Sequence, residues 1–176
     1  TAYDAKGMLL EAIRDPDPVM FFEPLRGYRL TRDEVPAGDY TVPFGKLRVV
    51  REGTDVTIVT WSASVPVAEA AAEELAEKGI SAHVIDLRTL VPLDEAGLVE
   101  AVERTGRCVV LHEGQATAGF GAEVIALLQE QAFYSLEAPV KRVTAPDAPY
   151  PMPSIEQFYI PDTSKVIRAV HEVLRD

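Results

Sequence analysis

The stretch LRVVREGTDVTIVT, residues 47–60, decides the fold class. It contains two short runs rich in Val, Ile and Thr, residues 47–51 and 55–60, and such runs are typical of β-strands. Only Glu52-Gly53-Thr54 separates the two runs, so we expect an antiparallel hairpin. Apolar residues at helical spacing follow over residues 65–78, which predicts a helix packed on these strands.

Strands and helices continue to alternate further along the chain. Strands are predicted at residues 80–86, 107–112 and 139–144, and helices at residues 94–105, 121–133 and 162–174. This alternation is typical of a mostly parallel sheet with helices on both faces. We therefore expect an α/β fold: a three-layer α/β/α domain over residues 46–176, whose sheet is mostly parallel with its first strand antiparallel.

Residues 1–45 are organised differently. Residues 2–14 carry apolar side chains at helical spacing, and the prolines of Asp15-Pro16-Asp17-Pro18 end this predicted helix. The apolar run Val-Met-Phe-Phe at residues 19–22 predicts a short buried strand. Residues 23–46 form a long connector punctuated by Pro and Gly, which predicts a domain boundary. One helix and one strand cannot bury their own apolar faces, so they either pack on the rest of the chain or are the tail of another domain.

The composition limits the classes of partner. The 176 residues carry 17 Lys and Arg against 28 Asp and Glu, a net charge of −11, which disfavours nucleic acid and anionic membranes as partners. The single cysteine, Cys108, excludes an internal disulfide and is consistent with a reducing cytoplasm. The polar N-terminus predicts no signal peptide, and no apolar run approaches the roughly 18 residues of a membrane span.

Ligands of open α/β sheets bind beyond the carboxyl ends of the strands. Those ends are predicted at Trp61-Ser62, Asp86-Leu87-Arg88, His112-Glu113 and residues 145–147. His112-Glu113 is the sharpest candidate, since a His and a Glu are suited to general acid–base chemistry. We favour the alternative that these two side chains face opposite ways and serve packing or an interface, because no nucleophile lies nearby in sequence. Asp86 and Arg88 are expected to pair with each other or across an interface.

The remaining candidates favour structural roles. The loop GQATAGFGAE, residues 114–123, lacks both the Lys of a phosphate loop and the glycine spacing of a dinucleotide fingerprint, so we expect a tight turn. His83, His171 and Trp61 are expected to be packing or surface residues. Two interpretations stay open for the Pro-rich loop at residues 145–161, a protein contact surface or a cover for the domain's own core. They concern its large side chains Tyr150, Met152, Phe158 and Tyr159.

Segments along the whole chain resemble one family. They are YDAKGML (3–9), PVMFFEP (18–24), EGTDVTIV (52–59), VIDLRTL (84–90), His112-Glu113, GFGAE (119–123) and LEAPV (136–140). With these segments in this order, the chain resembles the C-terminal part of the β subunit of the E1 component of 2-oxo acid dehydrogenase complexes, of pyruvate or branched-chain type. It departs from the family pattern mildly, at Trp61-Ser62-Ala63 and at Ala118-Gly119.

The resemblance implies a transketolase C-terminal domain over residues 46–176. It also implies that residues 1–45 are the last helix and strand of a pyrimidine-binding domain plus a linker, and that Thr1 is not a natural start. The implied reaction is oxidative decarboxylation of a 2-oxo acid, with transfer of the acyl group to lipoyl-E2. The full-length α2β2 enzyme of the family binds thiamine diphosphate and Mg²⁺ through residues outside this segment. We therefore expect no catalytic or cofactor-binding residue here, and a role mainly in assembly.

The partners that the resemblance implies are the E1 α subunit, a second β subunit and the E2 subunit-binding domain. That E2 domain is small and basic, so the charge of −11 complements it, and Glu137 and Asp176 are the expected contacts. Two alternatives stay open. The first is that the chain is a free-standing module that binds a small anion at His112-Glu113. The second is that it is the C-terminal domain of another transketolase-like enzyme.

The resemblance also implies a potassium site at the end of the first helix. E1 β subunits hold this ion where the helix ends before the strand, and the matching residues are Ala12, Asp15 and Asp17. Ala12 would offer its backbone carbonyl, and the two aspartates backbone or side-chain oxygens. Terminal helix carbonyls carry partial negative charge, and hard cations prefer oxygen ligands. The alternative is that Asp15 and Asp17 merely end the helix.

Overall fold

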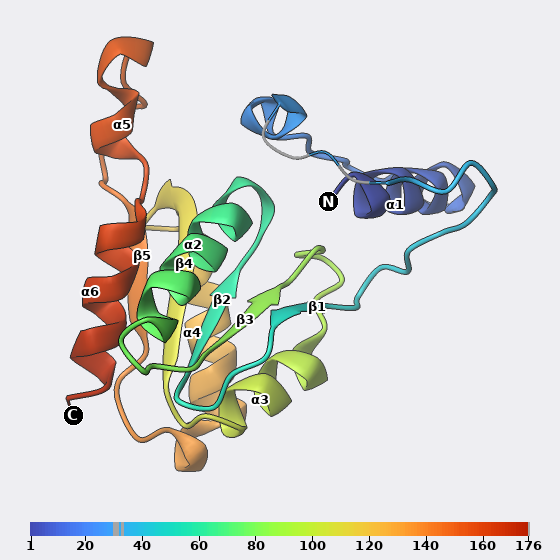
Figure 1. The fold of residues 1–176 in the computed structure, drawn as a ribbon. Coiled ribbons are helices and arrows are strands. Elements are labelled where there is room, and N and C mark those ends of the chain that lie inside the picture. The colour runs from blue at the N-terminus through green and yellow to red at the C-terminus, as the bar shows by residue number, and fades with distance from the viewer. Residues whose placement is uncertain (30–31, 33, 176) are drawn as a thin grey trace.

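A five-stranded sheet dominates the computed structural model, which describes residues 1–29, 32 and 34–175 (Figure 1). The strands are β1 (Arg48–Arg51), β2 (Val56–Thr60), β3 (Ala82–Asp86), β4 (Cys108–Gln115) and β5 (Lys141–Ala145). Their order across the sheet is β1-β3-β2-β4-β5, with β1 antiparallel to β3 and all other pairs parallel. The predicted sheet, mostly parallel with its first strand antiparallel, is confirmed.

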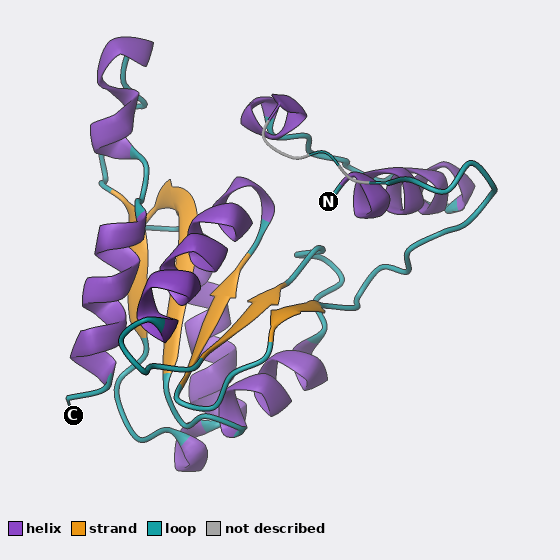
Figure 2. Ribbon diagram, in the orientation of Figure 1, coloured by secondary structure: helices purple, strands orange, loops and turns teal. Residues whose placement is uncertain are grey.

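Helices cover both faces of the sheet (Figure 2). Helices α2 (Val65–Ala76) and α6 (Thr163–Val173) bury Leu75 and Val170 against one face, where Ile58 of β2 meets them. Helices α3 (Glu95–Glu103) and α4 (Gly121–Gln131) bury Leu98 and Leu128 against the other face. The predicted three-layer arrangement is therefore confirmed.

The predicted hairpin of the first two strands is wrong. Strand β1 pairs with β3, and β2 lies between β3 and β4. The Glu52-Gly53-Thr54 connection carries the chain past β3 rather than back along β1. Gly53 makes this route possible, because a Cβ on Gly53 would lie 2.1 Å from the carbonyl carbon of Ala82 and 2.3 Å from the nitrogen of His83. Turn length alone does not specify which strand becomes the neighbour.

The N-terminal segment forms the predicted helix but not the predicted strand. Helix α1 (Ala2–Arg14) is followed by an irregular stretch at residues 19–22, in which Met20 and Phe22 are each 80% exposed. The strand prediction was wrong because an apolar run needs a neighbouring strand, and none of the described residues supplies one. A short 3₁₀ helix, η1 (Leu25–Arg29), comes next.

Helix α1 contacts the chain through a face other than its apolar one. Its buried residues are Asp4 and Gly7, while Ile13 of the predicted apolar stripe is 70% exposed. Gly7 lies so close to the connector that a Cβ there would be 2.5 Å from Cγ2 of Val42. The apolar stripe of α1 thus faces away from the residues that the structure describes.

The Pro-rich segment after β5 projects beyond the sheet as an arm (Figure 1). Short helices η2 (Ser62–Ser64), η3 (Phe133–Ser135), η4 (Pro153–Ile155) and α5 (Glu156–Tyr159) complete the fold, the last two in this arm. Tyr159 is buried, its hydroxyl donates to the carbonyl of Ala148 at 3.0 Å and its ring meets Tyr150, so it packs within the Pro-rich segment. Tyr150, Met152 and Phe158 remain 61%, 76% and 74% exposed. None of the described helices has the length and hydropathy needed to cross a bilayer.

Replacing Gly53 with Ala tests the packing of this connection. The added Cβ would meet the backbone of β3, which cannot move without disrupting the sheet, so we expect a loss of unfolding free energy of about 2 kcal/mol or more. Urea denaturation measures it. Gly38→Ala is the matched control, because a Cβ at Gly38 has nothing within 4 Å. Equal stabilities of the two variants would contradict the packing described here.

Candidate functional site

The carboxyl ends of the central strands are the most constrained part of the backbone. Among the described residues, three that are not glycine adopt left-handed conformations, and each follows a different strand. Ser62 follows β2 with φ 56°, Arg88 follows β3 with φ 58°, and Ala118 follows β4 with φ 58°. Such conformations persist only where surrounding contacts impose them, and they often cluster at functional sites. This edge of the sheet is therefore the candidate site.

Side chains fill the position where open α/β sheets bind ligands. The strand order reverses between β2 and β4, and ligands bind at the carboxyl ends beside such a reversal. Here the ring of Trp61 stacks on His112, with centroids 5.0 Å apart and planes 12° apart. Phe120 meets the other part of Trp61 edge-on at 5.8 Å. The predicted packing role of Trp61 is confirmed, and this packing occupies the crevice.

The loop after β4 closes over His112. A Cβ on Gly121 would lie 2.5 Å from Nε2 of His112, and one on Gly119 would lie 2.1 Å from the carbonyl oxygen of Gln115. Only glycine fits at these two points, so the predicted tight turn between strand and helix is confirmed.

His112 and Glu113 do not form an acid–base pair. His112 is 3% exposed, whereas Glu113 is exposed, so the two neighbours face opposite ways as the favoured interpretation holds. Burial lowers the pKa of His112 below its ordinary value of 6.5, and the positive charge of Arg142 lowers it further. Its Nε2 atom is buried and has no hydrogen-bond partner in the structure. These features describe a neutral packing histidine rather than an anion ligand.

An ion-pair cluster joins helix α1 to the carboxyl end of β3. Nη2 of Arg88 lies 2.8 Å from Oδ1 of Asp4, and Nε of Arg48 lies 3.5 Å from Oδ2 of the same carboxylate. The side chain of Asp4 is only 8% exposed. Removing one partner of such a buried pair typically costs about 3–5 kcal/mol, because the remaining charge stays desolvated. The cluster therefore holds the N-terminal segment against the sheet domain.

Asp86 completes this cluster. The predicted pairing of Asp86 with Arg88 is present, but only through the backbone of Arg88. Its Oδ1 accepts the backbone N–H of Arg88 at 3.0 Å, and its Oδ2 lies 3.4 Å from Nη2 of Arg48. The side chain of Arg88 itself pairs with Asp4. Sequence reasoning missed Asp4, since nothing in its local pattern connects it to a residue 84 positions away.

The last candidate strand end, after β5, is tied to the glycine loop. The backbone N–H and hydroxyl of Thr117 donate to the two oxygens of Asp147 at 2.9 and 2.7 Å. These hydrogen bonds, the backbone one first, hold the pKa of Asp147 below its ordinary value. Asp147 thus joins two loops at the carboxyl edge.

The other candidates occupy structural positions. His83 is buried in β3, where burial lowers its pKa, and its Nδ1 lies 3.6 Å from Oε2 of Glu52. Cys108 is buried too, which raises the pKa of its thiol. Glu137 is exposed and pairs with Arg107 at 2.6 Å. His171 is partly buried on α6, and Asp176 lies outside the described residues.

The predicted cation ligands lie together at the end of α1. Asp15 caps the helix, and its Oδ1 accepts the backbone N–H of Asp17 at 2.9 Å. Pro16 stands four residues after Ala12 and has no N–H, so the carbonyl of Ala12 lacks its normal helical donor. These oxygens suit a hard cation. Within the described ranges, no three His, Cys, Asp or Glu side chains gather as a metal site, so backbone carbonyls would have to complete the ligand set.

Comparison with known proteins identifies the class. Residues 45–166 match the family model described as the transketolase C-terminal domain, and the chain belongs to that family. The fold agrees with a solved split-gene transketolase, an inactive β4 tetramer. It aligns with a TM-score of 0.69 and 32% identity over 81% of this chain and 46% of that one.

Curated relatives narrow the class further. The chain is 48% identical over 174 residues to the pyruvate dehydrogenase E1 component subunit beta of Bacillus subtilis, covering 99% of this chain and 54% of that protein. It is 46% identical over 175 residues to the mitochondrial 2-oxoisovalerate dehydrogenase subunit beta of Dictyostelium discoideum, covering 99% of this chain and 47% of that protein. The resemblance to E1 β subunits is thus confirmed over nearly the whole chain. The chain spans about half the length of these relatives.

The stacking of Trp61 on His112 predicts a pH-dependent fluorescence signal. Trp61 is the single tryptophan, and protonation places a positive charge against its ring. Because burial lowers the pKa of His112, we expect a fluorescence change with a midpoint below 6.5. Between that midpoint and 6.5 the unfolded chain binds the extra proton, so this histidine makes the fold less stable as the pH falls through that range.

The controls are His112→Gln, which should abolish the fluorescence change, and His171→Gln, which should leave it intact. Fluorescence titration and urea denaturation at pH 7.5 and 5.5 measure the two effects. A midpoint at or above 6.5, or an unchanged titration in His112→Gln, would show that the ring is not buried as described.

Proposed function

We propose that this chain acts as part of the β subunit of an E1 component that oxidatively decarboxylates a 2-oxo acid. The observation that carries the proposal is identity of 45–48% to both pyruvate and 2-oxoisovalerate dehydrogenase β subunits over 98–99% of the chain. Identity to the split-gene transketolase is lower, at 32%. The two kinds of β subunit match nearly equally, so the proposal covers 2-oxo acid dehydrogenases rather than one substrate.

Within such an enzyme, the residues described here serve assembly. The carboxyl edge of the sheet is filled by Trp61 and His112, and Arg88 holds the preceding helix through Asp4. Thiamine diphosphate with Mg²⁺ supplies the decarboxylation chemistry in the proposed enzyme. The residues here do not fit that cofactor, because the glycines of the loop after β4 pack on His112 instead of presenting an open cradle. We assign no residue of this chain to it.

The proposed partners are an E1 α subunit, a second β subunit and the subunit-binding domain of E2, in an α2β2 tetramer. Helix α1 supports such contacts, because Leu9 and Ile13 of its apolar stripe are 41% and 70% exposed. The charge of −11 supports attraction to a basic E2 domain. Glu137 is accessible for this contact, although Arg107 already neutralises part of its charge. We also propose the boundary between the two parts of the chain near residue 45.

Reconstitution tests this function. The 176-residue chain mixed with an E1 α subunit, 2-oxo acid and an electron acceptor should show no turnover, because the residues that bind the cofactor lie elsewhere. The complete β polypeptide carrying these residues should restore it. Turnover by this chain without further β residues would contradict the assembly role. Failure of the complete polypeptide with both pyruvate and branched-chain 2-oxo acids would contradict the dehydrogenase proposal.

We further propose a potassium site formed by Ala12, Asp15 and Asp17. The support is the capping geometry of Asp15 and the prolines at positions 16 and 18, which deprive the last helix carbonyls of N–H donors. An ion there would neutralise the partial negative charge of the helix end. Oxygens from other parts of the enzyme would complete the coordination.

Thermal denaturation of the complete β polypeptide in potassium and in tetramethylammonium chloride tests the site. We expect a higher melting temperature in potassium, because a ligand that binds the folded state stabilises it. Asp15→Ala and Asp17→Ala should each reduce the difference between the salts. Asp39→Ala is the control, because this exposed aspartate pairs with Arg14 of the same helix without being a proposed ligand. Equal melting temperatures in both salts would rule the site out.

A further inference from the structure

Strand β5 leaves one edge of the sheet open. It pairs with β4 on one side and with none of the described strands on the other. A cleft of about 180 Å³ runs between this edge and α6. Its lining includes four consecutive residues, 141–144, and successive side chains of a strand point to opposite faces. The wall of the cleft is therefore the backbone edge of β5, whose outward N–H and C=O groups are available for pairing.

The cleft is basic although the chain is acidic. Lys141, Arg142, Lys165 and Arg168 line it against one acid, Glu172, so its formal charge is 4 − 1 = +3 in a chain of −11. Glu172 pairs with Lys141 at 3.3 Å. The rest of the protein is negatively charged. This group of cations therefore distinguishes the β5 edge from the remaining surface.

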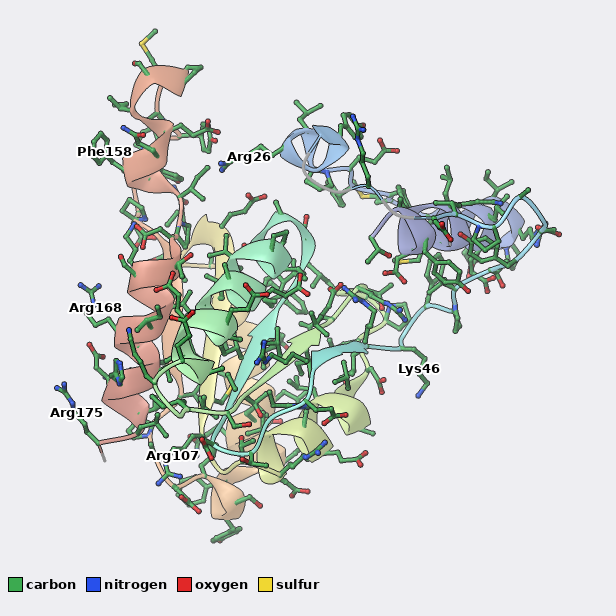
Figure 3. All side chains as sticks on the ribbon, in the orientation of Figure 1. Arg26, Lys46, Arg107, Phe158, Arg168 and Arg175 are labelled. Atoms are coloured by element: carbon green, nitrogen blue, oxygen red, sulfur yellow. The ribbon has the colours of Figure 1, made fainter. Side chains whose placement is uncertain are left out.

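The two arginines that line the cleft, Arg142 and Arg168, form no ion pair with the described residues. Arg142 is exposed and donates one N–H to the carbonyl of Ala116 at 2.8 Å, on the face of the sheet opposite α6, and its charge helps to lower the pKa of Asp147. Arg168 is exposed and projects from α6 away from the domain, on the same side as Arg175 (Figure 3). Each guanidinium therefore has donors left for a bidentate contact with a carboxylate.

The length of this basic surface favours an extended ligand. Lys165 and Arg168 lie on one side of α6, whose 11 residues span about 16 Å. The five residues of β5 span about 17 Å. A single phosphate or carboxylate is much shorter than either element. A peptide strand of about five residues matches both, with its acidic side chains at every second position facing α6.

From this match we infer that the β5 edge binds an extended acidic peptide segment of a partner protein, as an additional strand of the sheet. Backbone pairing with β5 would supply affinity, and contact of a carboxylate that faces α6 with Arg168 would supply specificity. This inference does not depend on the proposed enzyme function. The inferred partner segment is acidic, so it differs from the basic E2 domain proposed above.

Fluorescence anisotropy of the 176-residue chain with a labelled eight-residue peptide of alternating Glu and Val tests the inference. We expect saturable binding that weakens as salt rises. Arg168→Glu should weaken it by about tenfold or more, because like charges then face each other across the cleft. Arg51→Glu is the matched control, because Arg51 lies on β1 at the opposite edge of the sheet and has no ion-pair partner in the described chain. It should bind like the unmodified protein.

Three further probes separate strand pairing from simple charge attraction. A peptide with Gln in place of Glu should bind at least about tenfold more weakly if the carboxylates matter. A Glu peptide with two central prolines should also lose binding, since proline cannot donate to a strand partner. Equal binding of the proline peptide, displacement by tripolyphosphate at equal charge, or equal effects of Arg168→Glu and Arg51→Glu would each overturn the inference.

Discussion

The complete burial of strand β2 is the constraint on which the rest of the structure depends. All five of its residues are buried, both of its edges pair with parallel strands, and helices cover both of its faces. Of its two threonines, Thr57 is hydrogen-bonded, with its hydroxyl 2.7 Å from the carbonyl of Ala101 and 2.8 Å from the hydroxyl of Thr105, whereas the buried hydroxyl of Thr60 has no partner in the described structure. A strand placed this way requires parallel neighbours, and parallel neighbours require helical crossovers. The three-layer architecture follows from the position of one five-residue segment.

This dependence explains which parts of the fold were predictable. The alternation of strand and helix is a local property of the sequence, and each predicted helix or strand after residue 46 is present. The hairpin was wrong because strand adjacency is a long-range property that turn length does not encode. A usable signal existed, since the charged ends of β1, Arg48 and Arg51, are typical of an edge strand, while residues 56–60 contain no charge. The strand predicted at residues 19–22 failed for a related reason, because hydrophobicity alone does not provide a pairing partner.

The position of the candidate site could be predicted from the sequence, but the contacts between its side chains could not. Strand ends directed attention to Trp61, Arg88 and His112, and all three lie at the carboxyl edge. The stacking of Trp61 on His112 joins residues 51 positions apart, and the pair of Asp4 with Arg88 joins residues 84 positions apart. No local pattern contains either contact. The left-handed conformations of Ser62, Arg88 and Ala118 are likewise imposed by packing, because none of these residue types favours that region on its own.

The same contacts explain why a fold best known for binding ligands at one edge is used differently here. Trp61 stacks on His112 between β2 and β4, and Asp4 brings helix α1 against the end of β3, so these parts of the carboxyl edge are committed to internal contacts. A fold fixes where a site can form, whereas the side chains at that place decide whether it does. A pocket lined by residues that include Thr117 and Asp147 remains beyond the ends of β4 and β5, and β5 ends the sheet without a described partner. The surfaces that we propose to meet other polypeptides are therefore the exposed residues of α1 and the edge of β5.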